Sequence, residues 1–181
     1  MRGRILDLGS SIGHLTTYYG LRSVGRHVVG CDFSRKSVGR AIKEAKRRKL
    51  ANVSFEVCDI TQLLPAGNFD VIASTQVLAD VSNRREVIDL AVRILSPTGI
   101  IVSVEALGTA HKAAQFIQDV STSGLKLVNF RFVYFSDLGE RGCYPMFTFA
   151  RSSDVLEPHL EDRYALAIEA VSPIVGSVEA E

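Results

Sequence analysis

The chain has 181 residues, of which 46% are hydrophobic and 23% charged, which is typical of one globular domain and excludes a largely disordered chain. The formal net charge of +1 argues against a protein built mainly to bind nucleic acid or an anionic membrane surface. There is no apolar run long enough for a signal peptide, and none approaches the roughly 18 residues of a membrane span. We therefore expect a cytoplasmic protein that does not span membranes.

Short apolar runs alternate with longer amphipathic runs, which predicts βαβ units around a parallel sheet. Turn residues at 96–99 should end one helix and begin the fifth strand. The fold class is thus predicted to be α/β, a doubly wound and mostly parallel sheet. The predicted strands are residues 4–9, 27–32, 53–59, 69–74 and 99–106, and the predicted helices are residues 13–24, 37–49, 84–95 and 110–123.

Two further apolar runs, residues 125–135 and 143–150, follow closely enough to form an antiparallel hairpin. This hairpin would place one reversed strand near the edge of the sheet. The cysteines are widely spaced, with no CxxC pair and no histidine at ligand spacing, so we expect free thiols and no metal site. They are Cys31, Cys58 and Cys143.

The turn after the first strand, Gly9-Ser10-Ser11-Ile12-Gly13, fits more than one kind of site. A dinucleotide site carries G-x-G-x-x-G, but Ser11 takes the place of the middle glycine and the third is absent. The same residues satisfy the G-x-S-x-G pattern of a hydrolase elbow. That reading lacks an earlier strand for an oxyanion loop, and its acid and histidine would be the remote Asp137 and His159.

Three carboxylates, Asp7, Asp32 and Asp59, lie at the ends of the first three strands. The carboxyl ends of parallel strands form the rim where ligands bind in open α/β sheets, and Asp32 follows the turn by about twenty residues, the spacing at which a carboxylate binds ribose hydroxyls. Asp59 can accept a hydrogen bond from an adenine amine, and Asp7 can stabilise an ammonium group. An acidic rim suits a nucleoside with a cationic amino-acid arm better than an anionic dinucleotide.

Over about residues 4–150, these motifs resemble the class I S-adenosylmethionine-dependent methyltransferases. "ILDLGSSIG" is similar to the first motif of that family, "VVGCDFS" to its second-strand acid, "VSFEVCDI" to its third-strand acid and "FDVIASTQVL" to its fourth strand. The resemblance implies a Rossmann-like fold, S-adenosyl-L-methionine as cofactor, and methyl transfer to an oxygen, nitrogen or carbon atom of a small molecule. It assigns no catalytic residue.

The resemblance also implies a role for each matched position. Asp7 would lie near the ammonium group, and Asp32 would hold the ribose. Phe33 would pack on the adenine, whose edge Asp59 and Ile60 would flank. The remaining positions form two groups: Gly9, Ser10, Ser11 and Gly13 would line the methionine arm, and Ser74 and Thr75 would face the donor methyl.

The chain departs from the family pattern in three respects, the first two of which keep an alternative open and the third of which argues against methylation of nucleic-acid bases. Ser11 replaces the usual glycine, and Met1 lies only a few residues before the first strand, where the family has helices that cover the cofactor. The fourth strand continues as "STQVLAD", which differs from the Asn-Pro-Pro-Tyr type of exocyclic-amine methyltransferases of nucleic acids. The alternative is a non-catalytic binding module or partner subunit, and a second copy or another subunit would then cover the open site.

Residues 151–181 lie beyond the resemblance, which defines a main domain of residues 1–150 and a C-terminal tail. Pro158 suits the start of a helix and Ser172-Pro173 suits its end. We expect a helical tail that packs on its own sheet or against a neighbouring helix, docks on a second copy or shields the cofactor rim. Its apolar stripe, at three- and four-residue spacing, comprises Leu160, Tyr164, Ala167, Ile168 and Val171.

Overall fold

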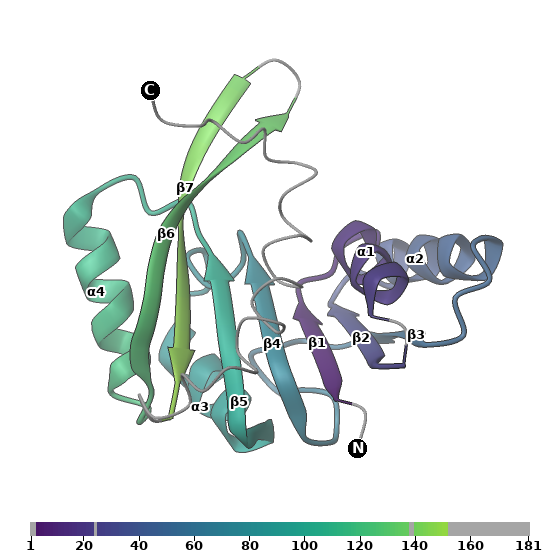
Figure 1. The fold of residues 1–181 in the computed structure, drawn as a ribbon, viewed down its shortest axis with the longest axis horizontal. Coiled ribbons are helices and arrows are strands. Elements are labelled where there is room, and N and C mark those ends of the chain that lie inside the picture. Colours follow the sequence, from purple (N-terminus) through teal and green to yellow (C-terminus); the bar gives the residue numbers. More distant parts are fainter. Residues whose placement is uncertain (1–2, 24, 138–139, 152–181) are drawn as a thin grey trace.

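The computed structural model, drawn in Figure 1, describes residues 3–23, 25–137 and 140–151. Each helix and strand predicted within residues 4–150 is present, with ends that differ from the predicted ones by four residues at most. The predicted helical tail lies outside the described residues. In chain order the elements are β1 (Arg4–Leu8), α1 (His14–Arg22), β2 (His27–Asp32), α2 (Arg35–Arg47), β3 (Val53–Val57), β4 (Phe69–Thr75), α3 (Arg84–Ile94), β5 (Leu95–Val104), α4 (Ala110–Ser121), β6 (Lys126–Asp137) and β7 (Glu140–Ala150).

The strands form one sheet in the order β3-β2-β1-β4-β5-β7-β6. Strands β1 to β5 pair in parallel, and β7 is antiparallel to both β5 and β6. The predicted hairpin, with one reversed strand near the edge, is therefore confirmed. Strand order reverses between β1 and β4, which is where an open α/β sheet leaves a crevice for a ligand.

The prediction for residues 96–99 was wrong in one respect. They do not separate α3 from β5, because α3 ends at Ile94 and β5 begins at Leu95. Leu95 pairs with Phe69, and the next paired residue, Ile100, lies opposite Val71 with a shift in register. The turn residues therefore form an irregularity inside the strand, where the extra residues are accommodated beside β4.

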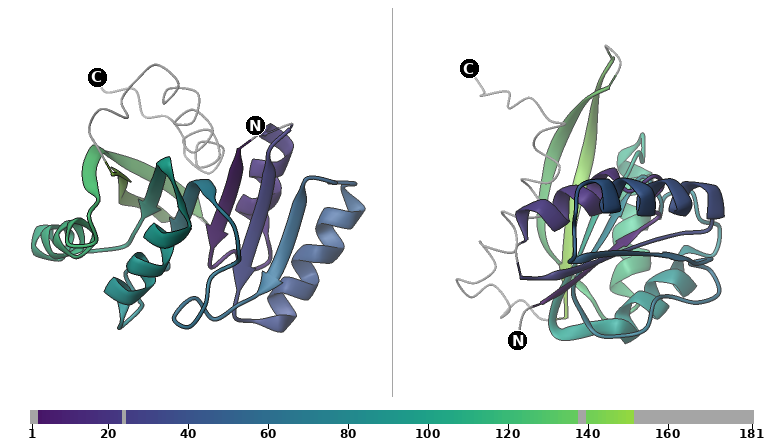
Figure 2. Two further views of the ribbon diagram at one scale, coloured as in Figure 1. Left: turned by 90° about the horizontal axis from the view of Figure 1, so that it is seen from below. Right: turned by 90° about the vertical axis from the view of Figure 1, so that its right-hand side faces the viewer.

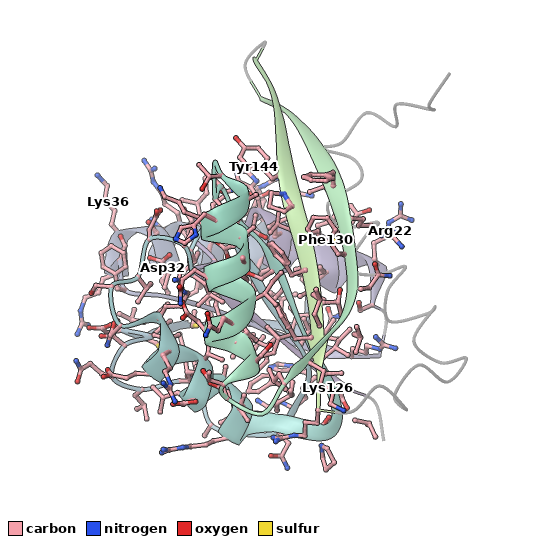
Figure 3. All side chains as sticks on the ribbon, turned by 90° about the vertical axis from the view of Figure 1, so that its left-hand side faces the viewer. Arg22, Asp32, Lys36, Lys126, Phe130 and Tyr144 are labelled. Carbon is pink, nitrogen blue, oxygen red and sulfur yellow. The ribbon has the colours of Figure 1, made fainter. Side chains whose placement is uncertain are left out.

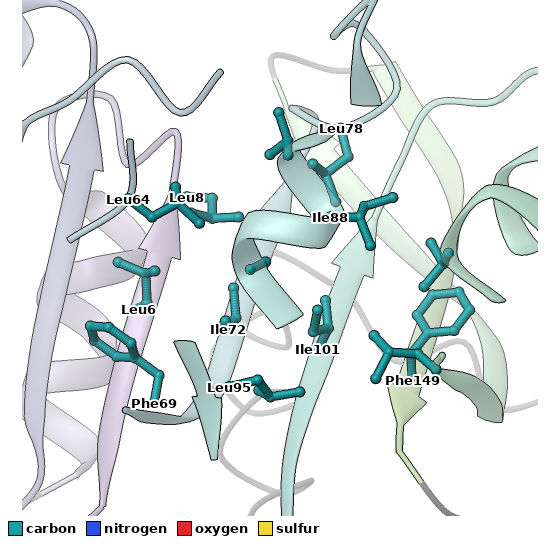
Figure 4. Close-up of a cluster of buried hydrophobic side chains, with 14 of the residues drawn as sticks. Leu6, Leu8, Leu64, Phe69, Ile72, Leu78, Ile88, Leu95, Ile101 and Phe149 are labelled. Atoms are coloured by element: carbon teal, nitrogen blue, oxygen red, sulfur yellow. The ribbon is translucent and has the colours of Figure 1, made fainter. Parts of the chain in front are cut away.

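Helices cover the two sides of the sheet unequally. Figure 2 (right) shows α1 and α2 on one side of the strands, with α3 on the other. The core on the α3 and α4 side is packed from aliphatic and aromatic side chains of both layers (Figure 4), among them Leu6, Phe69, Ile72, Ile88, Ile101, Phe116 and Phe149. No helix in the described part of the chain is long and apolar enough to cross a membrane.

Candidate functional site

The turn between β1 and α1 needs residues that tolerate a left-handed backbone. Gly9 and Gly13 have φ angles of 66° and 83°, and Ser11 has a φ of 49°. A Cβ on Gly9 would lie 2.4 Å from Cγ2 of Val77, and one on Gly13 would lie 2.7 Å from Cζ of Phe55. Both glycines are therefore fixed by close packing as well as by φ, and Ser11 adopts the conformation that glycine adopts more readily.

Asp32 ties this turn to the start of α2. Its Oδ2 accepts a hydrogen bond from the backbone N–H of Ser11 at 2.9 Å, and its Oδ1 accepts one from Ser34 N–H at 2.8 Å. The residue is 8% exposed. Each carboxylate oxygen retains acceptor capacity, because an ionised carboxylate has about four lone-pair sites. The sequence-predicted ribose acceptor is thus held rigidly at the carboxyl end of β2.

A cavity of about 530 Å³ lies at the carboxyl ends of β1, β2, β3 and β4. This volume is within the usual range for small-molecule sites. Five predicted site residues line it together, and one of them, Phe33, is 79% exposed. Its walls comprise the predicted Gly9, Asp32, Phe33, Asp59 and Ile60, with Cys58, Thr61, Gln76, Val77, Asp80 and Val81, to which the sequence assigned no role.

Asp59 supplies an exposed negative charge to this cavity. Its Oδ1 accepts hydrogen bonds from the hydroxyl of Thr61 at 2.7 Å and from the N–H of Thr61 at 3.0 Å. These bonds lower the pKa of the Asp59 carboxyl below its ordinary value. The neighbouring Cys58 is a free thiol that donates to the carbonyl of Leu63, and Cys31 is also free.

A smaller cavity of about 180 Å³ shares Gly9 with the first. Asp7 lines it, is 2% exposed and accepts a hydrogen bond from Thr16 Oγ1 at 2.6 Å. Burial raises the pKa of Asp7 from 3.8 to about 7, with the Thr16 hydrogen bonds opposing and the charge of Asp32 adding to the rise. Near neutral pH, Asp7 therefore takes up or loses a proton readily. The other walls are Ser10, Ser11, Ile12, His14, Leu15 and Thr75.

The hydroxyl of Ser10 is the unsatisfied polar atom of this smaller cavity. Ser10 is 7% exposed, and its Oγ has no hydrogen-bond partner among the described residues. A buried hydroxyl without a partner is costly, so such a group beside a cavity is suited to contact a polar ligand.

Two residues named from the sequence lie elsewhere. Gly13 lies at the start of α1, packed against Phe55 and Ala41. Ser74 is 1% exposed and donates to Glu105 Oε1 at 3.0 Å. Neither belongs to the walls of the two cavities. Their expected contacts with the cofactor remain predictions.

Glu105, to which the sequence assigned no role, holds a wall of the larger cavity in place. It is fully buried directly after β5, where Oε1 accepts from the hydroxyls of Ser74 and Ser103. Burial raises the pKa of the Glu105 carboxyl, and these hydrogen bonds oppose the rise. Its oxygens also accept from three consecutive backbone N–H groups, at 3.0 to 3.3 Å, in Val77, Leu78 and Ala79.

This carboxylate fixes the loop after β4 that forms one wall of the larger cavity. The loop begins at Gln76, which has a φ of 56° and whose N–H donates to the carbonyl of Val104. The side chain of Gln76 accepts from the N–H of Ala106 at 3.0 Å. Glu105 is therefore a positioning residue, because it acts on the cavity through the backbone of the loop.

The sequence profile of a family described as a methyltransferase domain matches residues 2–150. Phosphoethanolamine N-methyltransferase of Triticum aestivum is 30% identical over 128 residues, which cover 70% of this chain and 25% of that protein. Demethylmenaquinone methyltransferase of Clavibacter sepedonicus is 36% identical over 106 residues, covering 56% of this chain and 40% of that protein. The chain thus spans between a quarter and two fifths of the length of these curated relatives.

Solved structures share the fold at low sequence identity. A SAM-dependent methyltransferase from Aquifex aeolicus superposes with a TM-score of 0.67 at 16% identity, covering 81% of each chain. Magnesium protoporphyrin IX methyltransferase from Synechocystis PCC 6803, solved with bound SAM, gives 0.65 at 21% identity, covering 82% of this chain and 69% of the other. These similarities show a common architecture.

Proposed function

This chain belongs to the methyltransferase domain family, and from that premise we propose that it transfers a methyl group from S-adenosyl-L-methionine to an oxygen, nitrogen or carbon atom of a small molecule. The observation that carries the proposal is the pair of adjoining cavities at the point where strand order reverses, with Asp7, Asp32 and Asp59 on their walls. Three carboxylates suit a ligand with net positive charge.

The chemistry of the walls fits the parts of this cofactor. In the larger cavity Asp32 accepts from the ribose hydroxyls, Phe33 packs on the adenine, and Asp59 with Ile60 flanks the edge of the base. In the smaller cavity Ser10, with its unsatisfied hydroxyl, and Ser11 line the methionine arm, near Asp7 and Thr75. Gly9 lies between the two, where any larger side chain would collide with Val77.

When bound, the cofactor supplies a methyl group that its sulfonium already activates. The protein is then required mainly to bind, to orient and to exclude water, and effective molarities of roughly 10⁵ M or more are available from orientation alone. The loop held by Glu105 and the turn held by Asp32 supply that rigidity. We assign no general base, because methyl transfer from a sulfonium does not require a dedicated one in every case.

The proposal of a small-molecule acceptor is supported by the names of the curated relatives, which act on phosphoethanolamine and demethylmenaquinone. The fourth strand continues into Ser74-Thr75-Gln76-Val77, which differs from the sequence that the base-methylating enzymes of nucleic acids carry. The acceptor would enter beside the loop that Glu105 holds.

Calorimetric titration of the full chain with S-adenosylmethionine, with its demethylated product and with NAD tests the proposal. We expect the first two to bind and NAD to bind at least about 100-fold more weakly, a difference of about 2.7 kcal/mol. Absence of binding at millimolar cofactor would refute the proposal. Binding without turnover over a broad panel of amines, phenols and quinols would instead support the alternative of a non-catalytic binding module.

A further inference from the structure

One half of the sheet is apolar on the side that carries α1. We call this surface the distal face and define it by side chains of β4, β5, β6 and β7. They form one cluster in which each is at most 6% exposed. The distal face comprises Val71, Ala73, Ile100, Val102, Val104, Val133 and Met146.

The described helices do not account for this burial. Helices α3 and α4 contribute Val87, Ile88, Phe116 and Val120 to the cluster on the opposite side of the sheet. On the side of the distal face, α1 and α2 contact mainly β2 and β3. Only α1 adds side chains to the distal cluster, at its β1 and β2 end, namely Leu15, Tyr18 and Tyr19. Among the described residues, no helix covers β5 and β7 on this side.

The described chain ends beside this surface. Ala150, the last residue of β7, pairs with Ile100 of β5 and belongs to the same cluster. The guanidinium of Arg151 then donates to the carbonyls of Val92 and Leu95, which anchors the end of the strand. Residues 152–181 therefore start at the border of the distal face.

The sequence of this segment suits an apolar sheet surface. Its apolar stripe, from Leu160 to Val171, lies between the helix signals of Pro158 and Ser172-Pro173. A helix of this length would extend about 22 Å. That exceeds the roughly 13 Å that β5 spans from Ile100 to Val104, so one such helix can cover the face.

Acidic and basic residues are unevenly distributed between residues 152–181 and the rest of the chain. Residues 152–181 hold seven of the 20 acidic residues and one of the 21 basic ones, so residues 1–151 carry a large excess of positive charge. Lys126 and Arg131 of β6 pair with Ala150 and Met146, which places both on the side of the distal face. Figure 3 shows Arg22, at the end of α1, and Lys126 on that same side of the β6–β7 hairpin.

We propose that residues 158–172 form an amphipathic helix that packs intramolecularly along β4, β5 and β7, as the cover of the distal face. The apolar stripe contacts Val71, Val102 and Met146, and the acidic side chains face the basic margin of Arg22, Lys126 and Arg131. This assignment is independent of the proposed function, since it concerns the sheet surface and not the cavities.

Photo-crosslinking of the full chain tests the placement directly. Benzoylphenylalanine at position 168, within the stripe, should form crosslinks to peptides containing residues 71–73, 100–104 or 146, at the mass of a single chain. The matched control carries the same group at Leu166, which lies on the opposite side of such a helix, and should lose these crosslinks. If position 168 formed crosslinks only at the mass of a dimer, the proposed intramolecular packing would be wrong. It would also be wrong if no crosslinks to these strands formed.

Substitution provides a second test. Ile168→Asp introduces a charge into the stripe and should lower Tm by at least about 5 °C and increase the binding of an apolar dye, whereas Leu166→Asp should lower Tm by less than about 2 °C. Equal effects of the two variants would overturn the proposal. Truncation after Arg151 should expose the distal face and cause concentration-dependent self-association in sedimentation. An unchanged monomer with unchanged dye binding would also overturn it.

Discussion

The two halves of the sheet's carboxyl edge use carboxylates in opposite ways. At the ends of β2 and β3, Asp32 and Asp59 lie on the wall of a cavity with acceptor capacity available to a ligand. After β5, Glu105 is fully buried and is surrounded by donors of the protein itself. The comparison teaches that the carboxylates of one half keep acceptor capacity facing a cavity, while the carboxylate of the other half fixes the loop that forms a wall of that cavity.

A large loss of stability is expected on the β5 half. Glu105→Gln places an amide N–H₂ among backbone N–H donors that need an acceptor, so the free energy of unfolding should fall by about 3 kcal/mol. Urea denaturation measures this loss. The exposed Glu56 of β3 provides the control, because Glu56→Gln should change stability by less than about 0.5 kcal/mol. If the two variants were equally stable, Glu105 would not hold the loop.

The next effect concerns the β2 half and is mainly on binding. Asp32→Asn should weaken the cofactor by about 1.5 to 3 kcal/mol, because it removes a charged acceptor for two hydroxyls. Asp70→Asn is the matched control: Asp70 accepts from the N–H of Arg4 at 2.7 Å, so it also holds backbone, but at the start of β4. Titration calorimetry should show an unchanged affinity for the control. Equal losses would mean that Asp32 acts only through the fold.

The difference between the halves also explains what the sequence could and could not predict. Asp32 and Asp59 lie at or just after the ends of apolar strands, and the carboxyl ends of neighbouring parallel strands meet at one edge of the sheet. The local sequence pattern was therefore enough to predict where these two residues lie. Glu105 also follows an apolar strand, but its bonding partners in the loop lie 26 to 28 residues earlier. Nothing in its neighbourhood in the chain distinguishes it from a solvent-exposed strand end.

Other differences have a similar origin. Ser74 stands at the end of β4, where the family resemblance predicts that it faces the donor methyl, and the structure adds that its hydroxyl donates to Glu105. The turn residues 96–99 were recognised correctly as irregular, but the pairing of Leu95 with Phe69 extends the strand before them. In both cases a partner distant in the sequence sets a detail that the local sequence does not determine.

A pH experiment distinguishes the buried carboxylate of Asp7 from the exposed carboxylate of Asp59. Because Asp7 has a pKa of about 7 in the folded protein and about 3.8 when unfolded, the native state retains a proton that the unfolded chain releases above about pH 4. The stability from this group is fully present below pH 4 and is lost as pH rises to about 7. The slope should approach 1.4 kcal/mol per pH unit in between.

Asp7→Asn should remove this part of the slope between pH 4 and 7. Glu105, whose pKa is also raised, contributes a slope of the same sign that remains in the variant. Asp59→Asn is the control, since the lowered pKa of Asp59 affects stability only below about pH 4. Denaturation at half-unit pH steps makes the comparison, and parallel profiles for Asp7→Asn and the parent chain would contradict the raised pKa.

The smallest expected effect lies in the turn that joins the two halves. Ser11 has a φ of 49°, which strains an L-residue, whereas the adjacent Ser10 has no positive φ. Ser11→Gly relieves the strain but makes the unfolded chain more flexible, so we expect a net gain of about 0.5 kcal/mol in stability. The hydrogen bond to Asp32 should persist, because the N–H that donates to Asp32 belongs to the backbone. The control Ser37→Gly, in the first turn of α2 where the residue has no positive φ, should have the opposite sign, a loss of about 0.5 to 1 kcal/mol, because it adds flexibility without relieving strain. Chemical denaturation of both variants decides the matter: if both lost stability equally, the left-handed conformation of Ser11 would carry no strain, and the departure from glycine at this position would be neutral for the fold.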